Sequence, residues 1–265
     1  MASRQTQIVY ARRRRRKYEA RLEAVFQQSM SRVYNEILKR NDVPGITSKS
    51  LVAAINDPNQ LAPMLALWRT QVDKTLIPTI LGVFRSAARD TLALPRLQAL
   101  SQALGPTFLD NIRNVRADEF LATVDNRLVG IGDTAFQDSQ EALRQAIDEG
   151  LSVPKQADAV RRQLAIGIRR ATMIARTEAG AAIGAADQAV GEEYAKEGWT
   201  VTKEWLATSD TRTREDHRNA DGQKVPIDHA FIVGGVSMMH PGDPSAPADQ
   251  TIQCRCTTIT DVEDD

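Results

Sequence analysis

The sequence predicts a mainly α-helical fold, with an elongated helical N-terminal body followed by a small C-terminal α+β module. Apolar residues recur at steps of three and four through most of the first 195 residues, which is the period of an amphipathic helix. Aromatic residues make up only 5% of a chain rich in Ala, Leu, Gln and Arg, and this composition favours helices. After Gly198 the pattern alternates with period two between turns rich in Gly and Pro. We therefore predict a basic N-terminal arm (1–18), a helical domain (19–195) and an α+β module (196–265).

Prolines, glycines and capping residues are expected to divide the helical domain into separate helices. Pro78 and Pro95 are expected to kink or break the second long segment, since proline lacks the N–H that a helix interior needs. Ser152 is a predicted N-cap, and the Ala- and Gly-rich helix before Gly198 is expected to pack tightly because small residues let another backbone approach. The expected helices cover about residues 19–40, 47–55, 59–104, 108–129, 133–149, 152–164 and 168–197.

The module is expected to hold short strands and one helical turn. The segment 199–205 alternates as a strand does, and 231–239 resembles two strands around a Gly-Gly hairpin turn. A helical turn is expected at 213–219, and the segment 251–260 is rich in β-formers and is predicted to be a strand.

Composition excludes several classes of protein. Two cysteines are too few for a disulfide scaffold. The longest apolar stretch, 76–84, is much shorter than the roughly 20 residues that span a bilayer. We expect a protein made in a reducing cytoplasm and not embedded in a membrane. The net charge is zero, but a basic beginning and an acidic end suggest that the ends of the chain take part in interactions.

The only two cysteines, Cys254 and Cys256, lie two residues apart. On a strand they would point to the same face, and a disulfide between them would be strained. Two interpretations stay open. The cysteines are small buried apolar residues, or they are ligands of a structural zinc ion completed by histidines, for which the expected set is Cys254, Cys256, His217 and His240. All three histidines of the chain lie in the module, although the cysteine spacing differs from the common Cys-x-x-Cys pattern.

Two charged segments are candidates for a role: one for contact with a partner, the other for an internal polar network. The run Arg12, Arg13, Arg14, Arg15, Arg16 and Lys17 suits nucleic-acid phosphates or an acidic protein surface, and a solvated tail is the alternative. Arg176 and Glu178 stand among alanines in a predicted helix, where they suggest an internal polar network or a solvated face. His217 lies in the turn sequence 213–222. A histidine there more often holds the turn by hydrogen bonds than takes part in catalysis.

Several ordered motifs resemble the phage Mu F-like minor head protein family, also called the SPP1-like head morphogenesis family. The resemblance covers about residues 150–260 and leaves the N-terminal body unmatched. The matching positions are Arg176, Thr177 and Glu178; Trp205; Asp210, Arg212, Arg214 and His217; Gly222; Pro241, Gly242, Asp243 and Pro244; and Cys254, Arg255 and Cys256.

The resemblance implies a low-copy virion protein at the portal vertex, in the capsid interior, which acts in head assembly and in DNA retention or ejection. Its implied partners are the portal protein, a capsid or scaffolding protein and packaged double-stranded DNA, with the host cytoplasm as the place of assembly. The family's module is also grouped with an ADP-ribosyltransferase-like fold, so a virion-carried effector enzyme is one alternative and a general nucleic-acid-binding protein another. The sequence contains no Glu-x-Glu pair, and we therefore expect no enzymatic activity.

The same resemblance suggests how the module closes. The two cysteines are expected to face the turn that carries His217. Arg255, on the other face, is expected to join the polar network by pairing with Glu178 or with an acidic loop.

Overall fold

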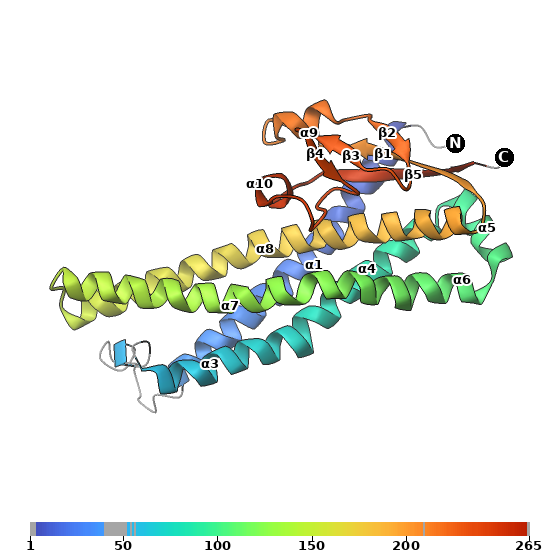
Figure 1. The fold of residues 1–265 in the computed structure, drawn as a ribbon. Helices are drawn as coiled ribbons and strands as arrows, with labels where there is room; N and C mark the ends of the chain where they lie inside the picture. The colour runs from blue at the N-terminus through green and yellow to red at the C-terminus, as the bar shows by residue number, and fades with distance from the viewer. Residues whose placement is uncertain (1–3, 40–51, 54, 56, 209, 264–265) are drawn as a thin grey trace. The chain divides into compact units, whose positions relative to one another are not determined.

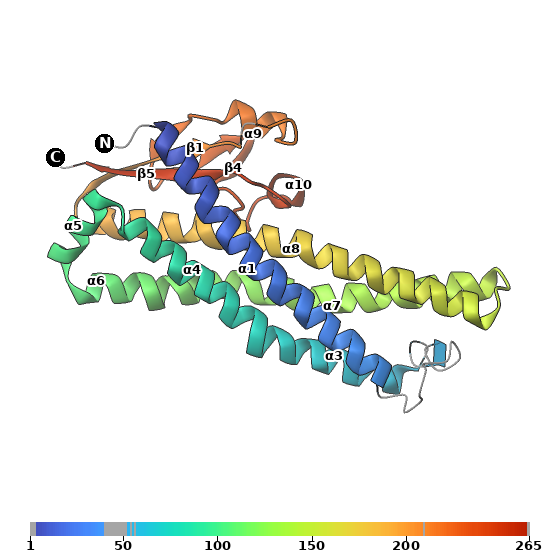
Figure 2. The ribbon, with the colours of Figure 1, turned by 180° about the vertical axis from the view of Figure 1, so that it is seen from behind.

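The computed structural model describes residues 4–39, 52–53, 55, 57–208 and 210–263 (Figure 1). Long helices dominate, and a small sheet lies near the C-terminus, which confirms the predicted fold class (Figures 1 and 2). The predicted short helix that ends at residue 55 falls largely outside the described residues. Among the described residues, no helix combines the length and the apolar character that crossing a membrane requires.

Several of the helices are longer than the sequence predicts, whereas the segment predicted as 59–104 is divided into shorter ones. The helical elements are α1 (Arg4–Lys39), α3 (Pro58–Gln71), the π-helical turn η1 (Val72–Leu76), α4 (Ile77–Leu92), α5 (Pro95–Leu104), α6 (Pro106–Asp110), the π-helical turn η2 (Asn111–Val115), α7 (Arg116–Asp148) and α8 (Val153–Lys196). The predicted breaks near residues 131 and 166 are wrong, because α7 and α8 run through Gly130 and Gly167. A glycine inside a helix costs only about 1 kcal/mol, which a packed helix tolerates.

The two prolines behave differently from one another. Pro95 starts α5 directly after Leu94, as a breaking proline should. Pro78 is the second residue of α4 and follows the π-helical turn η1, so the helical path continues past it. The basic run, predicted as an arm before the first helix, is instead part of α1.

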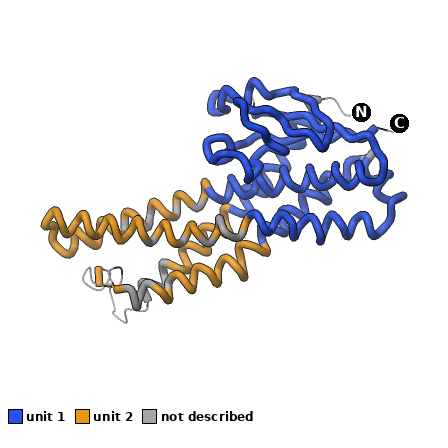
Figure 3. The backbone as a smooth tube through the Cα atoms, viewed as in Figure 1, with its two compact units in different colours: residues 1–22, 79–123, 174–265 blue, residues 23–78, 124–173 orange. Residues whose placement is uncertain are grey.

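The chain forms two compact units (Figure 3). Unit 1 comprises residues 1–22, 79–123 and 174–265, and unit 2 comprises 23–78 and 124–173. Unit 2 is helical and has its own internal contacts: the buried Trp68 indole donates to the carbonyl of Leu128 at 3.1 Å, and Gln27 donates to Thr172 at 2.8 Å. The predicted C-terminal module lies wholly within unit 1, while the predicted domain boundaries stay predictions.

Unit 1 contains the sheet. Strand β1 (Thr200–Leu206) pairs antiparallel with β2 (Lys224–Pro226) on one side and with β5 (Thr257–Glu263) on the other. A separate hairpin joins β3 (Phe231–Val233) to β4 (Val236–Met238). Its turn is Gly234-Gly235, both with positive φ, which confirms the predicted Gly-Gly hairpin.

Two short helices complete the module. They are α9 (Glu215–Asn219), at the predicted helical turn, and α10 (Ala248–Thr251). The predicted strand at 251–260 is wrong at its start, because Thr251 ends α10 and β5 begins only at Thr257. Cys254 and Cys256 lie in the connection between these elements, so their shared orientation does not come from strand pleating.

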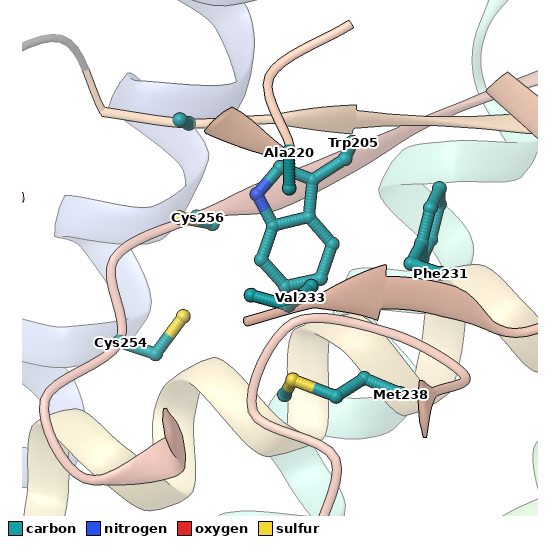
Figure 4. Close-up of a cluster of buried hydrophobic side chains, with 8 residues drawn as sticks. Trp205, Ala220, Phe231, Val233, Met238, Cys254 and Cys256 are labelled. Carbon is teal, nitrogen blue, oxygen red and sulfur yellow. The ribbon is translucent and has the colours of Figure 1, made fainter. Parts of the chain in front are cut away.

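The module's core is a cluster of buried apolar side chains from β1, the β3–β4 hairpin and the segments around them (Figure 4). Trp205 is its largest member, and its ring meets Phe231 edge to face at 5.3 Å. The remaining members are Ala207, Ala220, Val233, Met238, Cys254 and Cys256. The cysteines are therefore part of the hydrophobic core as well as neighbours of one another.

The C-terminal half of α8 packs closely against the module at two of its glycines. A Cβ at Gly184 would lie 2.6 Å from His240 Nδ1 and 2.6 Å from the carbonyl oxygen of Pro241. A Cβ at Gly191 would lie 2.6 Å from the end of the Ile227 side chain. These approaches confirm the prediction that small residues let other chain segments pack tightly against this helix.

Candidate functional site: a buried cysteine–histidine cluster

Three potential metal ligands converge inside unit 1. His217, on α9, lies with its Nδ1 3.4 Å from the Cys256 sulfur and 3.6 Å from the Cys254 sulfur. The three ligand atoms lie within 4.8 Å of one another, and all three residues are buried. The structure thus brings both cysteines to the imidazole of the Arg-His turn, as the sequence motifs suggest.

The surrounding elements fix the imidazole on its other sides. His217 Nε2 lies 2.9 Å from Oε1 of Gln250, which belongs to α10. The Trp205 ring meets the imidazole edge to face, with 5.6 Å between ring centroids. Since Oε1 of an amide only accepts hydrogen bonds, Nε2 carries the proton and Nδ1 faces the two sulfurs. In Figure 4, Cys254 and Cys256 lie on the same side of Trp205.

Arg15 holds the backbone that carries the cysteines. Its guanidinium, on α1, donates to the carbonyl oxygen of Cys256 at 2.8 Å and also to that of Cys254. Its Nε donates to Glu19 at 2.7 Å. A buried arginine bridging two carbonyls of one short segment fixes its conformation where no strand pairing does so.

The electrostatics of the cluster favour a thiolate at Cys254. A hydrogen bond from Cys256 lowers the pKa of Cys254, with further lowering from His217 and Arg15 against the opposing effect of burial. The same hydrogen bond and burial raise the pKa of Cys256. Burial lowers the pKa of His217, but the contact with Cys254 outweighs it and the net shift is upward. A thiolate is the form in which cysteine ligates metals.

The two nitrogen–sulfur separations fit those of a tetrahedral zinc site. Zn–N distances of about 2.0–2.1 Å and Zn–S distances of about 2.3 Å at a tetrahedral angle require N···S separations of about 3.6 Å. The observed separations are 3.4 and 3.6 Å. The hydrogen bond from Nε2 to Gln250 is the outer contact that a metal-ligating histidine ordinarily makes.

His240, the fourth predicted ligand, is not part of this group. The group of possible ligands found among the described residues contains His217, Cys254 and Cys256. The buried ring of His240 packs instead against α8 at Gly184, with Nδ1 3.2 Å from the carbonyl oxygen of Pro241. Burial lowers the pKa of His240, so the ring is held neutral. The sequence placed it with the cysteines because all the histidines lie in the module, which does not determine where each ring points.

The predicted polar network forms in one of the two expected ways. Arg255 forms a bidentate pair with Asp210, with both N···O distances at 2.5 Å, and so takes the acidic loop rather than Glu178 as its partner. This pair lowers the pKa of Asp210. Glu178 is buried and Arg176 is exposed on the same helix.

The basic run separates into buried and exposed positions on α1. Arg14 and Arg15 are buried, whereas Arg12, Arg13, Arg16 and Lys17 are exposed. Arg14 pairs with Asp187 of α8, and Arg15 contacts the cysteine segment. A run of like charges on a helix spans all of its faces, so two of the six residues serve the interior of unit 1.

Comparison with known proteins bears on this region of the chain. The family model described as Phage Mu protein F like protein matches residues 137–259. Residues 137–259 are therefore similar to this family. The match contains all three residues of the cysteine–histidine cluster and confirms the resemblance drawn from the motifs. No solved structure matches the chain.

Two curated relatives share part of the sequence. The chain is 32% identical over 140 residues to an NAD(+)–arginine ADP-ribosyltransferase EFV of Enterococcus faecalis, which is 53% of this chain and 28% of that protein. It is 32% identical over 120 residues to the Minor head protein GP7 of Bacillus phage SPP1, which is 44% of this chain and 38% of that protein. The chain thus spans well under half the length of either relative. A head protein and a protein named as a transferase both resemble this chain, so similarity alone does not separate the two roles.

Proposed function

We propose that this protein is a minor head protein of a bacteriophage, a virion component that acts in head assembly. The observation that carries the proposal is the Mu F-like region at residues 137–259, together with similarity to a phage protein named as a minor head protein. Within the region, the geometry supports a structural role. The cysteine–histidine cluster is sealed inside the core, where no substrate reaches it.

The finer proposal places the protein at the portal vertex in the capsid interior, in few copies. Its partners there are the portal protein, a capsid or scaffolding protein and packaged double-stranded DNA, and it acts in DNA retention or ejection. The exposed cations Arg12, Arg13, Arg16 and Lys17 support a contact with DNA or an acidic portal rim, because they form a charged surface on a folded helix.

Virion composition tests this proposal. Purified particles are analysed by mass spectrometry for the protein, and crosslinking identifies its neighbours. The proposal expects the protein in DNA-filled heads, with crosslinks to the portal protein. Absence from particles, while the protein is abundant in the infected cell, would contradict it. Crosslinks only to the major capsid protein would contradict the portal placement alone.

We further propose that the cysteine–histidine cluster holds a structural zinc ion. Three of its four ligands would be Cys254, Cys256 and Nδ1 of His217, and the zinc would join α9 to the segment before β5. A zinc ion held in this way supplies folding free energy, which a module of few and short strands needs.

A second candidate function is ADP-ribosyl transfer, which the similarity to the Enterococcus faecalis protein favours. Two observations weigh against it: the sequence has no Glu-x-Glu pair, and the match covers only 28% of that relative. An NAD-consumption assay with arginine-rich protein as acceptor separates the two functions. The head-protein proposal expects no NAD consumption above a buffer control.

A further inference from the structure

Unit 1 has an arginine-lined cleft between the N-terminal part of α1 and the loops of the module. Its volume is about 640 Å³. Seven of its lining side chains are arginines: Arg12, Arg15 and Arg16 on α1, Arg176 on α8, and Arg212, Arg214 and Arg255 from the module loops. Two carboxylates, Glu19 and Asp210, also line it. The cleft therefore gathers cations from four separate stretches of the chain.

The helix contributes one defined face to this cleft. Arg12, Arg15, Arg16 and Glu19 are spaced by three and four residues, so they lie along one stripe of α1. Arg13, in the same basic run, does not line the cleft, and it is exposed elsewhere on the helix. Only some of the neighbouring arginines of the basic run therefore line the cleft, although all carry the same charge.

Both carboxylates of the cleft are already engaged. Glu19 accepts a hydrogen bond from Arg15 at 2.7 Å, and Asp210 makes the bidentate pair with Arg255. Arg214 donates to the carbonyl oxygen of Ile252 at 2.6 Å, a neutral partner. The Arg212 guanidinium makes a long contact of 3.8 Å with Asp210, to which the Arg212 backbone N–H also donates at 3.0 Å. The guanidinium charge of the cleft therefore exceeds its carboxylate charge by five.

We propose that this cleft binds phosphate groups. A guanidinium presents a planar fork of donors that matches phosphate oxygens, and several of them around one hollow suit an anion with more than one charge. The exposed residues Arg12, Arg16 and Arg212 contact the ligand. Arg15 and Arg255 instead fix the lining of the cleft through their bonds to the Cys256 carbonyl and to Asp210. The phosphates belong either to a nucleic-acid backbone or to a free pyrophosphate-containing compound. The proposal stands apart from virion incorporation, which can succeed whether or not the cleft binds phosphate.

Fluorescence anisotropy with a labelled DNA duplex, and separately calorimetry with inorganic pyrophosphate, tests the cleft in the full-length protein. We compare wild type with Arg16→Gln/Arg212→Gln. Arg13→Gln removes an exposed charge of the same run outside the cleft and is the matched control for pyrophosphate, while Arg21→Gln, at an exposed arginine of α1 outside both the run and the cleft, is the control for DNA. For DNA, the cleft double variant should lower the slope of log affinity against log salt by about 2, since each lost phosphate contact lowers it by about 1. Arg13→Gln should retain the wild-type pyrophosphate affinity.

The two arms also identify the source of the phosphate. DNA binding that is lost in the double variant, without pyrophosphate binding, assigns the cleft to a nucleic-acid backbone, and the reverse assigns it to a free compound. Arg212→Lys keeps the charge without the fork and should recover only part of the affinity. Circular dichroism checks that the variants remain folded. Equal losses of pyrophosphate affinity in the double variant and in Arg13→Gln, equal losses of DNA affinity in the double variant and in Arg21→Gln, or no binding of either probe by the wild type, would overturn the proposal.

Discussion

Arg14 and Asp187 form a buried bidentate ion pair that joins α1 to α8. The two N···O distances are 3.0 and 2.9 Å, and Thr91 donates to the same carboxylate at 2.5 Å. Arg14 also donates to the carbonyl oxygen of Ala87. The pair therefore connects three helices of unit 1 through one carboxylate and one guanidinium, each less than a tenth exposed.

Replacing Arg14 with methionine should destabilise unit 1 strongly. The change leaves Asp187 buried without its counter-charge, and losing one partner of a buried pair typically costs 3–5 kcal/mol, so we expect a loss of about 4 kcal/mol. Urea unfolding followed by circular dichroism measures it. Arg13→Gln, at the adjacent exposed position, should change stability by less than about 0.5 kcal/mol. Asp187→Asn in the Arg14→Met background should recover part of the loss, and similar stability of Arg14→Met and Arg13→Gln would refute the role of the pair.

Metal analysis tests the cysteine–histidine cluster. Protein purified without chelators should carry about one zinc per chain, and Cys254→Ser or His217→Gln should lose it. Substituted Co²⁺ should show thiolate-to-metal absorption that disappears in the cysteine variant. His240→Gln serves as the control and should keep the metal, since His240 lies outside the ligand group. A native protein that is folded and metal-free would show that the cysteines are core residues alone.

The close approach at Gly184 predicts an unusual response to alanine. Gly184→Ala places a methyl group 2.6 Å from both the His240 ring and the Pro241 carbonyl, so it should destabilise the protein by about 1–3 kcal/mol despite alanine's better helix propensity. Gly130→Ala, inside α7, meets nothing within 4 Å and should stabilise by up to about 1 kcal/mol. Thermal unfolding compares the two variants. Stabilisation by both would mean that α8 does not pack closely at Gly184.

Lys203 predicts a pH dependence of stability. Burial lowers its pKa from about 10.5 to about 8, although Glu192, Asp243 and Asp228 favour the charged form. Between these values the unfolded chain binds more protons than the folded one, so the free energy of unfolding should rise with pH. The contribution is absent below about pH 8 and complete above about pH 10.5, with a size on the order of 1–3 kcal/mol.

Urea unfolding at a series of pH values across this range measures the effect. Lys203→Met removes the titrating group and should flatten the rise. Lys224→Met, at an exposed lysine of the neighbouring strand β2, should leave the rise unchanged. A wild-type profile that falls steadily through this interval would contradict the assignment.

The sequence predicts which helices, strands and turns form better than it predicts where each of them begins and ends. The Gly-Gly hairpin and the turn around His217 were predictable because local chemistry determines them. The continuity of α7 and α8 was not, since packing along a helix outweighs the small penalty of Gly130 or Gly167. The start of β5 was misplaced because Thr and Ile favour strands, while the turn before Cys254 depends on Gln253 at φ 56°.

The sequence predicted the potential ligands of the candidate site, but not the residues that hold them in position. Cys254, Cys256 and His217 stand out because the residue types are rare and lie in ordered motifs. Arg15 does not, since an arginine within a basic run looks solvated and its acceptors are main-chain carbonyls that leave no sequence signal. Gln250 is likewise invisible until the fold brings α10 beside the imidazole.

The contact between Arg15 and the Cys254–Cys256 backbone has a consequence for biosynthesis. The ribosome makes Arg15 239 residues before Cys254, so a nascent chain carries only one side of this contact while the intervening residues are made. Unit 1 combines residues 1–22, 79–123 and 174–265, so it cannot complete this contact until the segment that carries the cysteines has left the exit tunnel. The closure of unit 1 around Arg15 is therefore late relative to the synthesis of α1.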